Sequence, residues 1–181
     1  MSKKTTKPRF VLLDADVIIE AYQVEVWSAL IERLEIAIPS IVAHDEALFY
    51  SAEKRRIPYE IDLLRLVQEG KIREFTASAT EIRDLSNKFD RVFIEELHPG
   101  ETEALALIHF DKASEYKFCS GDKVAIQGLA MIGHSSNGIS MENFLKSVGL
   151  IKQLSYQFTE SYFKKWLEFG KQRRITGDGL N

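Results

Sequence analysis

Residues 10–16 read Phe-Val-Leu-Leu-Asp-Ala-Asp, and this short segment determines the predicted fold class. Four consecutive apolar residues without polar alternation are typical of a parallel strand that helices cover on both faces. Residues 36–38 form a second short strand, 116–120 are a third buried-strand candidate, and 72–75 and 132–134 are further strand candidates. Segments with the apolar spacing of helices separate these strand candidates. We therefore expect an α/β fold, a three-layer sandwich in which helices flank a central, mainly parallel sheet of four to five strands.

Between the strands, apolar residues recur at the three- and four-residue spacing of helices. The helices expected on this basis span 17–22, 27–34, 41–52, 60–69, 78–95, 101–112, 123–132, 141–148 and 159–170. Gly70 is placed to end the fourth of these, because glycine commonly follows the last helical residue. We expect residues 1–150 to form one domain. Residues 151–181 should add a helical extension and basic tail, packed on that domain or extending from it.

The composition is that of a folded globular protein. Of 181 residues, 45% are hydrophobic, and the formal net charge is only −3, which excludes a disordered chain. The mild acidity argues against a protein that coats nucleic acid, although it leaves room for a local basic groove. The single Cys119 excludes an intramolecular disulfide and a multi-cysteine zinc site, and its apolar neighbours predict a buried thiol. With no secretory signal and no long apolar run, we expect a cytoplasmic protein without a membrane partner.

Acidic residues follow two of the predicted strands. Asp14 and Asp16 follow the first, and Asp122 follows the strand at 116–120. Ligands of such sheets bind outside the carboxyl ends of the strands, so Asp14 and Asp122 should converge if their strands are neighbours. Further acids open two nearby helices, namely Asp45 or Glu46 and Glu101 or Glu103. Carboxylates without histidine or cysteine companions predict a site for Mg²⁺ or Mn²⁺, which activates water against phosphate esters.

Each of these acids also has a structural interpretation. Asp14 can be a turn residue, Asp16 a helix cap or supporting group, and Asp122 the cap of the helix that begins at Lys123. Glu101 and Glu103 can simply complement the helix dipole. Since they lie two residues apart, about 200° around a helix, at most one of them should face a pocket. The prediction of a site rests on the set of acids and not on one member.

The histidines and basic residues give no comparable pattern. The four histidines, His44, His98, His109 and His134, are scattered along the chain and predict no ligand set. Phosphate-binding glycine motifs and the serine-hydrolase signature are absent from the sequence. Two basic groups can contact a phosphate backbone or form solvated helix faces: Lys54, Arg55 and Arg56, and in the tail Lys164, Lys165, Lys171, Arg173 and Arg174.

Residues 10–150 resemble the PIN domain family of metal-dependent ribonucleases. The matching segments are 11–19, 38–48, 99–107 and 119–133. The resemblance implies that catalysis and metal binding fall on Asp14, Glu46, Glu103 and Asp122, supported by Asp16 and by the Ser120 hydroxyl. Asp45 fits the spacing after Pro39 slightly better than Glu46 does, and Glu101 competes with Glu103.

The resemblance also implies an activity and partners. It implies an endoribonuclease that hydrolyses RNA phosphodiester bonds with Mg²⁺ or Mn²⁺ and that forms a homodimer. Many members of the family are toxins of bacterial toxin–antitoxin pairs, so a small antitoxin protein is a possible partner. The extra C-terminal helix and basic tail of this chain leave the toxin assignment open.

Two alternatives remain at this point. Residues 12–16, with Gly121-Asp122 and 130–133, resemble haloacid dehalogenase-like phosphatases, in which Asp14 would be the nucleophile and Asp16 the general acid. That family usually has a second aspartate about four residues after the one matched by Asp122, where Ile126 and Gln127 stand here. It also assigns no role to the later glutamates. The other alternative is a non-catalytic PIN-fold interaction module.

Overall fold

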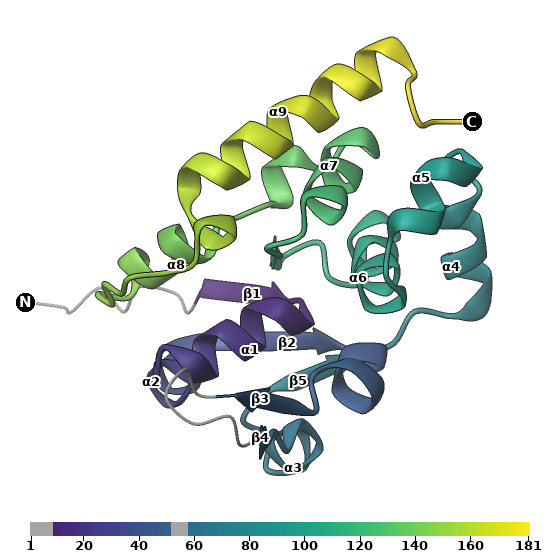
Figure 1. The fold of residues 1–181 in the computed structure, drawn as a ribbon. Coiled ribbons are helices and arrows are strands. Elements are labelled where there is room, and N and C mark those ends of the chain that lie inside the picture. The colour runs from purple at the N-terminus through teal and green to yellow at the C-terminus, as the bar shows by residue number, and fades with distance from the viewer. Residues whose placement is uncertain (1–8, 52–57) are drawn as a thin grey trace, which may run out of the picture.

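The structure is a computed structural model that describes residues 9–51 and 58–181. A parallel sheet forms its centre, with strands β1 (Arg9–Leu13), β2 (Leu34–Pro39), β5 (Arg73–Phe75) and β6 (Lys117–Cys119). Their order is β5-β2-β1-β6, and every neighbouring pair is parallel. β1 therefore lies inside the sheet, between β2 and β6 (Figure 1). This confirms the expected α/β class with a parallel central sheet of four strands.

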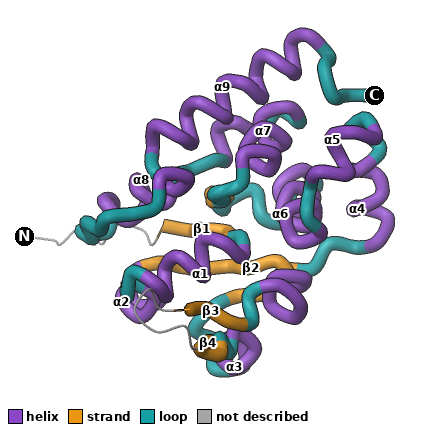
Figure 2. Tube along the Cα trace, in the orientation of Figure 1, coloured by secondary structure: helices purple, strands orange, loops and turns teal. Residues whose placement is uncertain are grey.

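Helices cover both faces of the sheet, as expected for a three-layer sandwich (Figure 2). Successive side chains of a strand point to opposite faces, so Val11 and Leu13 enter one core and Leu12 the other, all at most 1% exposed. The first core contains residues of α1 (Ala15–Gln23), α2 (Trp27–Arg33), α3 (Leu63–Gln68) and α8 (Met141–Ser147). The second contains residues of α4 (Ala79–Ser86), α5 (Arg91–Glu96), α6 (Pro99–His109) and α7 (Lys123–Met131).

A small antiparallel hairpin replaces part of two expected helices. After the π-helix η1 (Val42–Glu46), the chain forms β3 (Phe49–Ser51), which pairs with β4 (Pro58–Glu60). The predicted helix over 41–52 is therefore wrong beyond η1, and the one over 60–69 is confined to α3. Stacked rings stabilise a strand here instead of a helix. Tyr50 packs between Tyr22 of α1 and Tyr59 of β4, and its ring centroid lies 5.1 Å from that of Tyr22 and 5.2 Å from that of Tyr59.

Two other expected boundaries differ for local reasons. The helix expected over 78–95 is divided into α4 and α5, because the Asp90 side chain caps a new helix by accepting from the backbone N–H of Phe93 at 2.8 Å. The strand expected at 132–134 is wrong. There Gly133 takes a φ of +89°, and the N–H of His134 donates back to Leu129, which ends α7 in a turn. Gly70, with a φ of +68°, lies just beyond α3 as predicted.

The C-terminal segment forms α9 (Glu160–Thr176), which lies along α7 (Figure 1). Gly170 makes this close approach possible, since a Cβ there would lie 2.5 Å from the carbonyl oxygen of Gln127. The Arg173 guanidinium also donates to the Gln127 side chain at 3.3 Å. The extension therefore packs on the body that carries the sheet. No helix within residues 9–51 and 58–181 is long and apolar enough to span a membrane.

Candidate active site

The ends of β1 and β6 lie side by side at one edge of the sheet. The backbone N–H of Asp14 donates to the carbonyl of Cys119 at 3.1 Å, which fixes the residue after β1 beside the loop that follows β6. That loop, residues 120–122, leads directly into α7. The sheet order thus brings Asp14 and Asp122 to the same edge, as the two apolar runs predicted.

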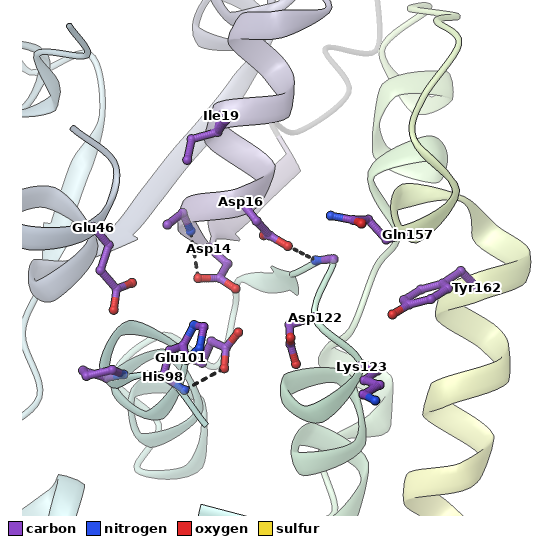
Figure 3. A pocket seen from close by; sticks show the side chains of 13 residues that line it. Asp14, Asp16, Ile19, Glu46, His98, Glu101, Asp122, Lys123, Gln157 and Tyr162 are labelled. Carbon is purple, nitrogen blue, oxygen red and sulfur yellow. Dashed lines mark hydrogen bonds between the residues drawn. The ribbon is translucent and has the colours of Figure 1, made fainter. Parts of the chain in front are cut away.

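A pocket of about 710 Å³ opens at this edge and is rich in carboxylates (Figure 3). Five acidic residues line it: Asp14, Asp16, Glu46, Glu101 and Asp122. They come from four different parts of the fold, namely the end of β1 with the start of α1, η1, the start of α6, and the start of α7. The remaining wall includes His98, Lys123, Gln157 and Tyr162. Such a concentration of carboxylates requires an explanation, because like charges repel one another.

Hydrogen bonds link the two aspartates through Ser120. The Ser120 hydroxyl donates to Asp14 Oδ2 at 2.7 Å, and the backbone N–H of Asp122 donates to that hydroxyl at 3.0 Å. Asp14 Oδ1 accepts from the N–H of Ala15 at 2.8 Å. Each carboxylate oxygen of Asp14 thus has one donor and keeps a second lone pair. The Ser120 hydroxyl therefore holds the Asp14 carboxylate in one orientation.

Asp16 lies beside Asp14 and is incompletely satisfied. Its Oδ2 accepts from the backbone N–H of Gly121 at 2.9 Å, and its buried Oδ1 has no hydrogen-bond partner within the described ranges. Gly121 permits this contact, since a Cβ there would lie 2.6 Å from Asp16 Oδ2. A buried, unpaired carboxylate oxygen is costly unless something positive or a donor approaches it.

Glu46, rather than Asp45, reaches the pocket. Glu46 is half-buried, and its carboxylate accepts from the backbone N–H of Gly100 in the first turn of α6 at 2.9 Å. Asp45 is exposed and does not line the pocket. The wider winding of the π-helix η1, closed by the Ala47 N–H on the Val42 carbonyl, turns Glu46 inward and leaves Asp45 outside, and the spacing from Pro39 carried no information about it.

The structure corrects the prediction for Glu103. Glu101 lines the pocket, whereas Glu103 lies on the other side of α6 and is buried at 1% exposure. There its carboxylate accepts from the Ser40 hydroxyl, the Ile41 N–H and the Ala77 N–H at 2.7, 2.8 and 3.0 Å. Glu103 therefore ties α6 to the ends of β2 and β5 and is a structural residue.

Burial and mutual repulsion raise the pKa of three of these acids. Burial raises the pKa of Asp14 to about 6, and the nearby charges of Glu46 and Asp122 act in the same direction. Burial raises the pKa of Glu101 to about 9, followed by the charges of Asp14 and Asp122. Burial and the Asp14 charge also hold the pKa of Asp16 well above its usual range. Without a compensating cation, the pocket therefore retains protons that ordinary carboxyl groups release.

The residues present fit a hard divalent cation. Five carboxylates line the pocket, Asp16 Oδ1 lacks a partner among the described residues, and positive charge would offset the repulsion. In the stretches 9–51 and 58–181, no three His, Cys, Asp or Glu side chains stand close enough to form a ligand set by themselves. Mg²⁺ in proteins is commonly held through one or two carboxylates and several waters.

Sequence reasoning missed four residues of the pocket wall. His98 precedes α6, and its place before the Pro-Gly pair at the start of a site helix was an available signal. Lys123 follows Asp122 directly. Gln157 lies just before α9 and Tyr162 lies on it. Both reach the pocket only because α9 packs on α7, so no local pattern marks them.

Other chemically reactive residues lie outside this pocket. Cys119 is fully buried, and burial raises the pKa of its thiol, in agreement with the predicted buried thiol. His109 and His134 are distant in sequence but have ring nitrogens 3.3 Å apart. The basic group of residues 54–56 lies outside the described residues.

Comparisons of the chain with protein-family models, with curated proteins and with solved structures find no match.

Proposed function

We propose that this protein is a metal-dependent endoribonuclease with a PIN-like fold that hydrolyses RNA phosphodiester bonds. The observation that carries the proposal is the convergence of Asp14, Asp16, Glu46, Glu101 and Asp122 on one pocket at the carboxyl ends of β1 and β6. A carboxylate cluster that keeps protons at neutral pH is unfavourable by itself. It is explained if the pocket binds Mg²⁺ or Mn²⁺ and presents it to an anionic substrate.

In this mechanism, Asp14, Glu46, Glu101 and Asp122 would hold the cation directly or through its waters, while Ser120 orients Asp14 and Asp16 orients the loop after β6. When bound, the cation lowers the pKa of a coordinated water and stabilises the developing charge on the phosphate. Lys123 lies beside Asp122 and supplies a positive charge for a phosphate of the strand.

Two observations favour the nuclease over the phosphatase alternative. Glu46 and Glu101 both line the pocket, and the phosphatase assigns them no role. In addition, both oxygens of Asp14 accept hydrogen bonds in a buried position, which suits a ligand held in one orientation better than a nucleophile. A non-catalytic module gives no reason for keeping five carboxylates together. The toxin role, an antitoxin partner and the homodimer are proposed on the resemblance alone.

The experiment that tests the proposal is an RNA cleavage assay with Mn²⁺ or Mg²⁺. The Asp14→Asn, Glu101→Gln and Asp122→Asn variants should each lose about 100-fold or more in rate, and a chelator should abolish cleavage. Asp45→Asn is the matched control, because Asp45 adjoins Glu46 but is exposed outside the pocket, and it should keep the full rate. A generic phosphomonoester substrate, assayed in parallel, should not be hydrolysed.

Cleavage that survives all three substitutions, or that ignores the chelator, would overturn the proposal. Hydrolysis of the phosphomonoester that depends on Asp14 but not on Glu101 would favour the phosphatase instead.

A further inference from the structure

A surface of aromatic and basic side chains leads out of the pocket along α9. We call it the α9 surface, and it consists of Tyr156, Tyr162, Trp166, Phe169, Lys123 and Lys165. Tyr162 and Lys123 also line the pocket, so the surface is continuous with the carboxylate site (Figure 3). Successive ring centroids, from Tyr156 to Phe169, are 5.4, 6.0 and 5.3 Å apart.

The rings of the α9 surface are not stacked in parallel. Two contacts are edge-to-face, with planes at 82° and 63°, and the third is tilted at 35°, so each contact covers only part of the ring area. Tyr156 is 64% exposed and Phe169 is 50% exposed. The stack of Tyr22, Tyr50 and Tyr59 is different, since its planes lie within 29° of parallel and the rings cover each other's faces. That stack stabilises the β3–β4 hairpin, whereas the α9 surface keeps exposed ring area that can contact a ligand.

The two lysines of the α9 surface carry positive charge that no carboxylate neutralises. Their ammonium groups lie 5.7 Å (Lys123) and 5.1 Å (Lys165) from the centroid of the Trp166 ring. In the part of the chain that the structure describes, neither comes within 4.0 Å of a carboxylate. By contrast, Lys164 on the same helix pairs with Glu160 at 3.1 Å. Lys123 and Lys165 are therefore free to contact phosphates next to the rings.

Charge explains why such a surface belongs beside this pocket. The carboxylates of the pocket repel a polyanion, so a nucleic acid needs attraction on its approach path. Basic groups that follow the backbone, together with aromatic rings on which bases stack, are the way proteins bind single strands. Paired bases are already stacked within their duplex and cannot use such rings.

We propose that the α9 surface binds the unpaired bases and phosphates of a single RNA strand that extends out of the pocket, and that it makes the protein select single strands over duplexes. The inference rests on the proposed function for the reaction in the pocket, but its binding prediction is measured separately from cleavage.

The test is the affinity of a fluorescently labelled 12-nucleotide oligouridine, followed by anisotropy with Mn²⁺ on the Glu101→Gln background, where cleavage should be suppressed. The single strand should bind at least tenfold more tightly than a hairpin of equal length. Phe169→Ala should weaken binding about tenfold, and Phe169→Tyr should restore it. Lys165→Ala should weaken binding and reduce the slope of log affinity against log salt by about 0.7.

Matched controls lie elsewhere on exposed surface. Ile175, also on α9 and 77% exposed, is apolar but lies outside the α9 surface, so Ile175→Ala should bind like the parent. Lys146 pairs with Glu142 on α8, and Lys146→Ala should also leave affinity unchanged. Trp166 gives a second readout, because Trp27 is only 5% exposed. A bound base should quench Trp166 fluorescence, and Trp166→Phe should remove the quench while retaining binding.

Unchanged affinity in both Phe169→Ala and Lys165→Ala, or equal affinity for strand and hairpin, overturns the inference. The inference is also overturned if the Phe169→Ala variant binds RNA normally but changes from a dimer to a monomer, because the α9 surface is then an interface between copies. If the parent chain binds the strand through this surface but cuts no RNA with Mn²⁺, the inference stands and the proposed nuclease activity fails.

Discussion

The carboxylate of Glu46 accepts a hydrogen bond from the backbone N–H of Gly100 at 2.9 Å, and so joins η1 to the first turn of α6. A Cβ at position 100 would lie 2.1 Å from Glu46 Oε2 and 2.8 Å from Val42 Cγ2. Val42 is fully buried and cannot retreat, so Glu46 must move. The absence of a side chain at Gly100 therefore allows this acid to reach the pocket.

We predict that Gly100→Ala reduces metal-dependent cleavage at least tenfold while the fold is kept. Overpacking costs about 1–3 kcal/mol, and the better helix propensity of alanine returns up to about 1 kcal/mol. Thermal unfolding and cleavage rate, measured on the same preparation, separate the two effects. Glu46→Gln is the companion variant, since it keeps an acceptor for the Gly100 N–H but removes the charge. A full cleavage rate in Gly100→Ala would show that the position of Glu46 does not matter.

Glu101 and Glu103 should respond to substitution in opposite ways. Glu103→Gln exchanges one acceptor oxygen for a donor amide, so at least one of the three donors that face this buried carboxylate loses its partner. We predict a loss of about 2–3 kcal/mol in the free energy of unfolding. Glu101→Gln should lose cleavage without losing stability. Denaturant unfolding and cleavage assays on both variants test the pair. A stable, inactive Glu103→Gln would restore the role that the sequence resemblance implied for Glu103.

Much of the fold and part of the site could be predicted from local sequence. The continuous apolar run before Asp14 indicates a strand covered on both faces, and Tyr116, Phe118 and Cys119 mark a second strand whose one polar residue, Lys117, is exposed. Once β1 and β6 are neighbours, Asp14 and Asp122 must lie together. This part depends on local patterns and on one rule of sheet geometry.

The rest depends on contacts between distant segments. Glu101 and Glu103 each suit the start of a helix, and only the packing of α6 against Ser40 and Ala77 separates them. The hairpin at β3 and β4 is fixed by stacking on Tyr22, which no spacing within residues 41–52 encodes. Tyr162 reaches the pocket only because α9 packs along α7.

Gly170 allows α9 to lie close enough to α7 for Tyr162 to form a pocket wall. A Cβ at this position would lie 2.5 Å from the Gln127 backbone oxygen and 2.8 Å from Ala130 Cβ. We predict that Gly170→Ala lowers the free energy of unfolding by about 1–3 kcal/mol, because the backbone atoms it meets cannot rotate away. It should also weaken single-strand binding. Ser161→Ala, an exposed change on the same helix, is the control for both measurements. An unchanged unfolding midpoint would mean that the contact of α9 with α7 is looser than the structure has it.

The raised pKa values of Asp14 and Glu101 predict an unusual dependence of stability on pH. A carboxyl group whose pKa is higher in the folded than in the unfolded chain stabilises the fold fully below its unfolded pKa, and this stabilisation is lost as the pH rises through the folded pKa. The relevant window runs from about pH 4 to about 6 for Asp14 and continues toward 9 for Glu101.

With a chelator present, the parent chain should therefore lose stability relative to Glu101→Gln as the pH rises from 5 to 8. The difference between their free energies of unfolding should change by on the order of a few kcal/mol. The comparison cancels the groups that titrate identically in both proteins. Mn²⁺ should reverse the loss, because it stabilises the ionised carboxylates, and should raise the parent's unfolding temperature more at pH 8 than at pH 5. Glu101→Gln should respond less to Mn²⁺. Equal stabilisation by Mn²⁺ at the two pH values, or an identical response in the variant, would mean that the cation does not bind through these carboxylates.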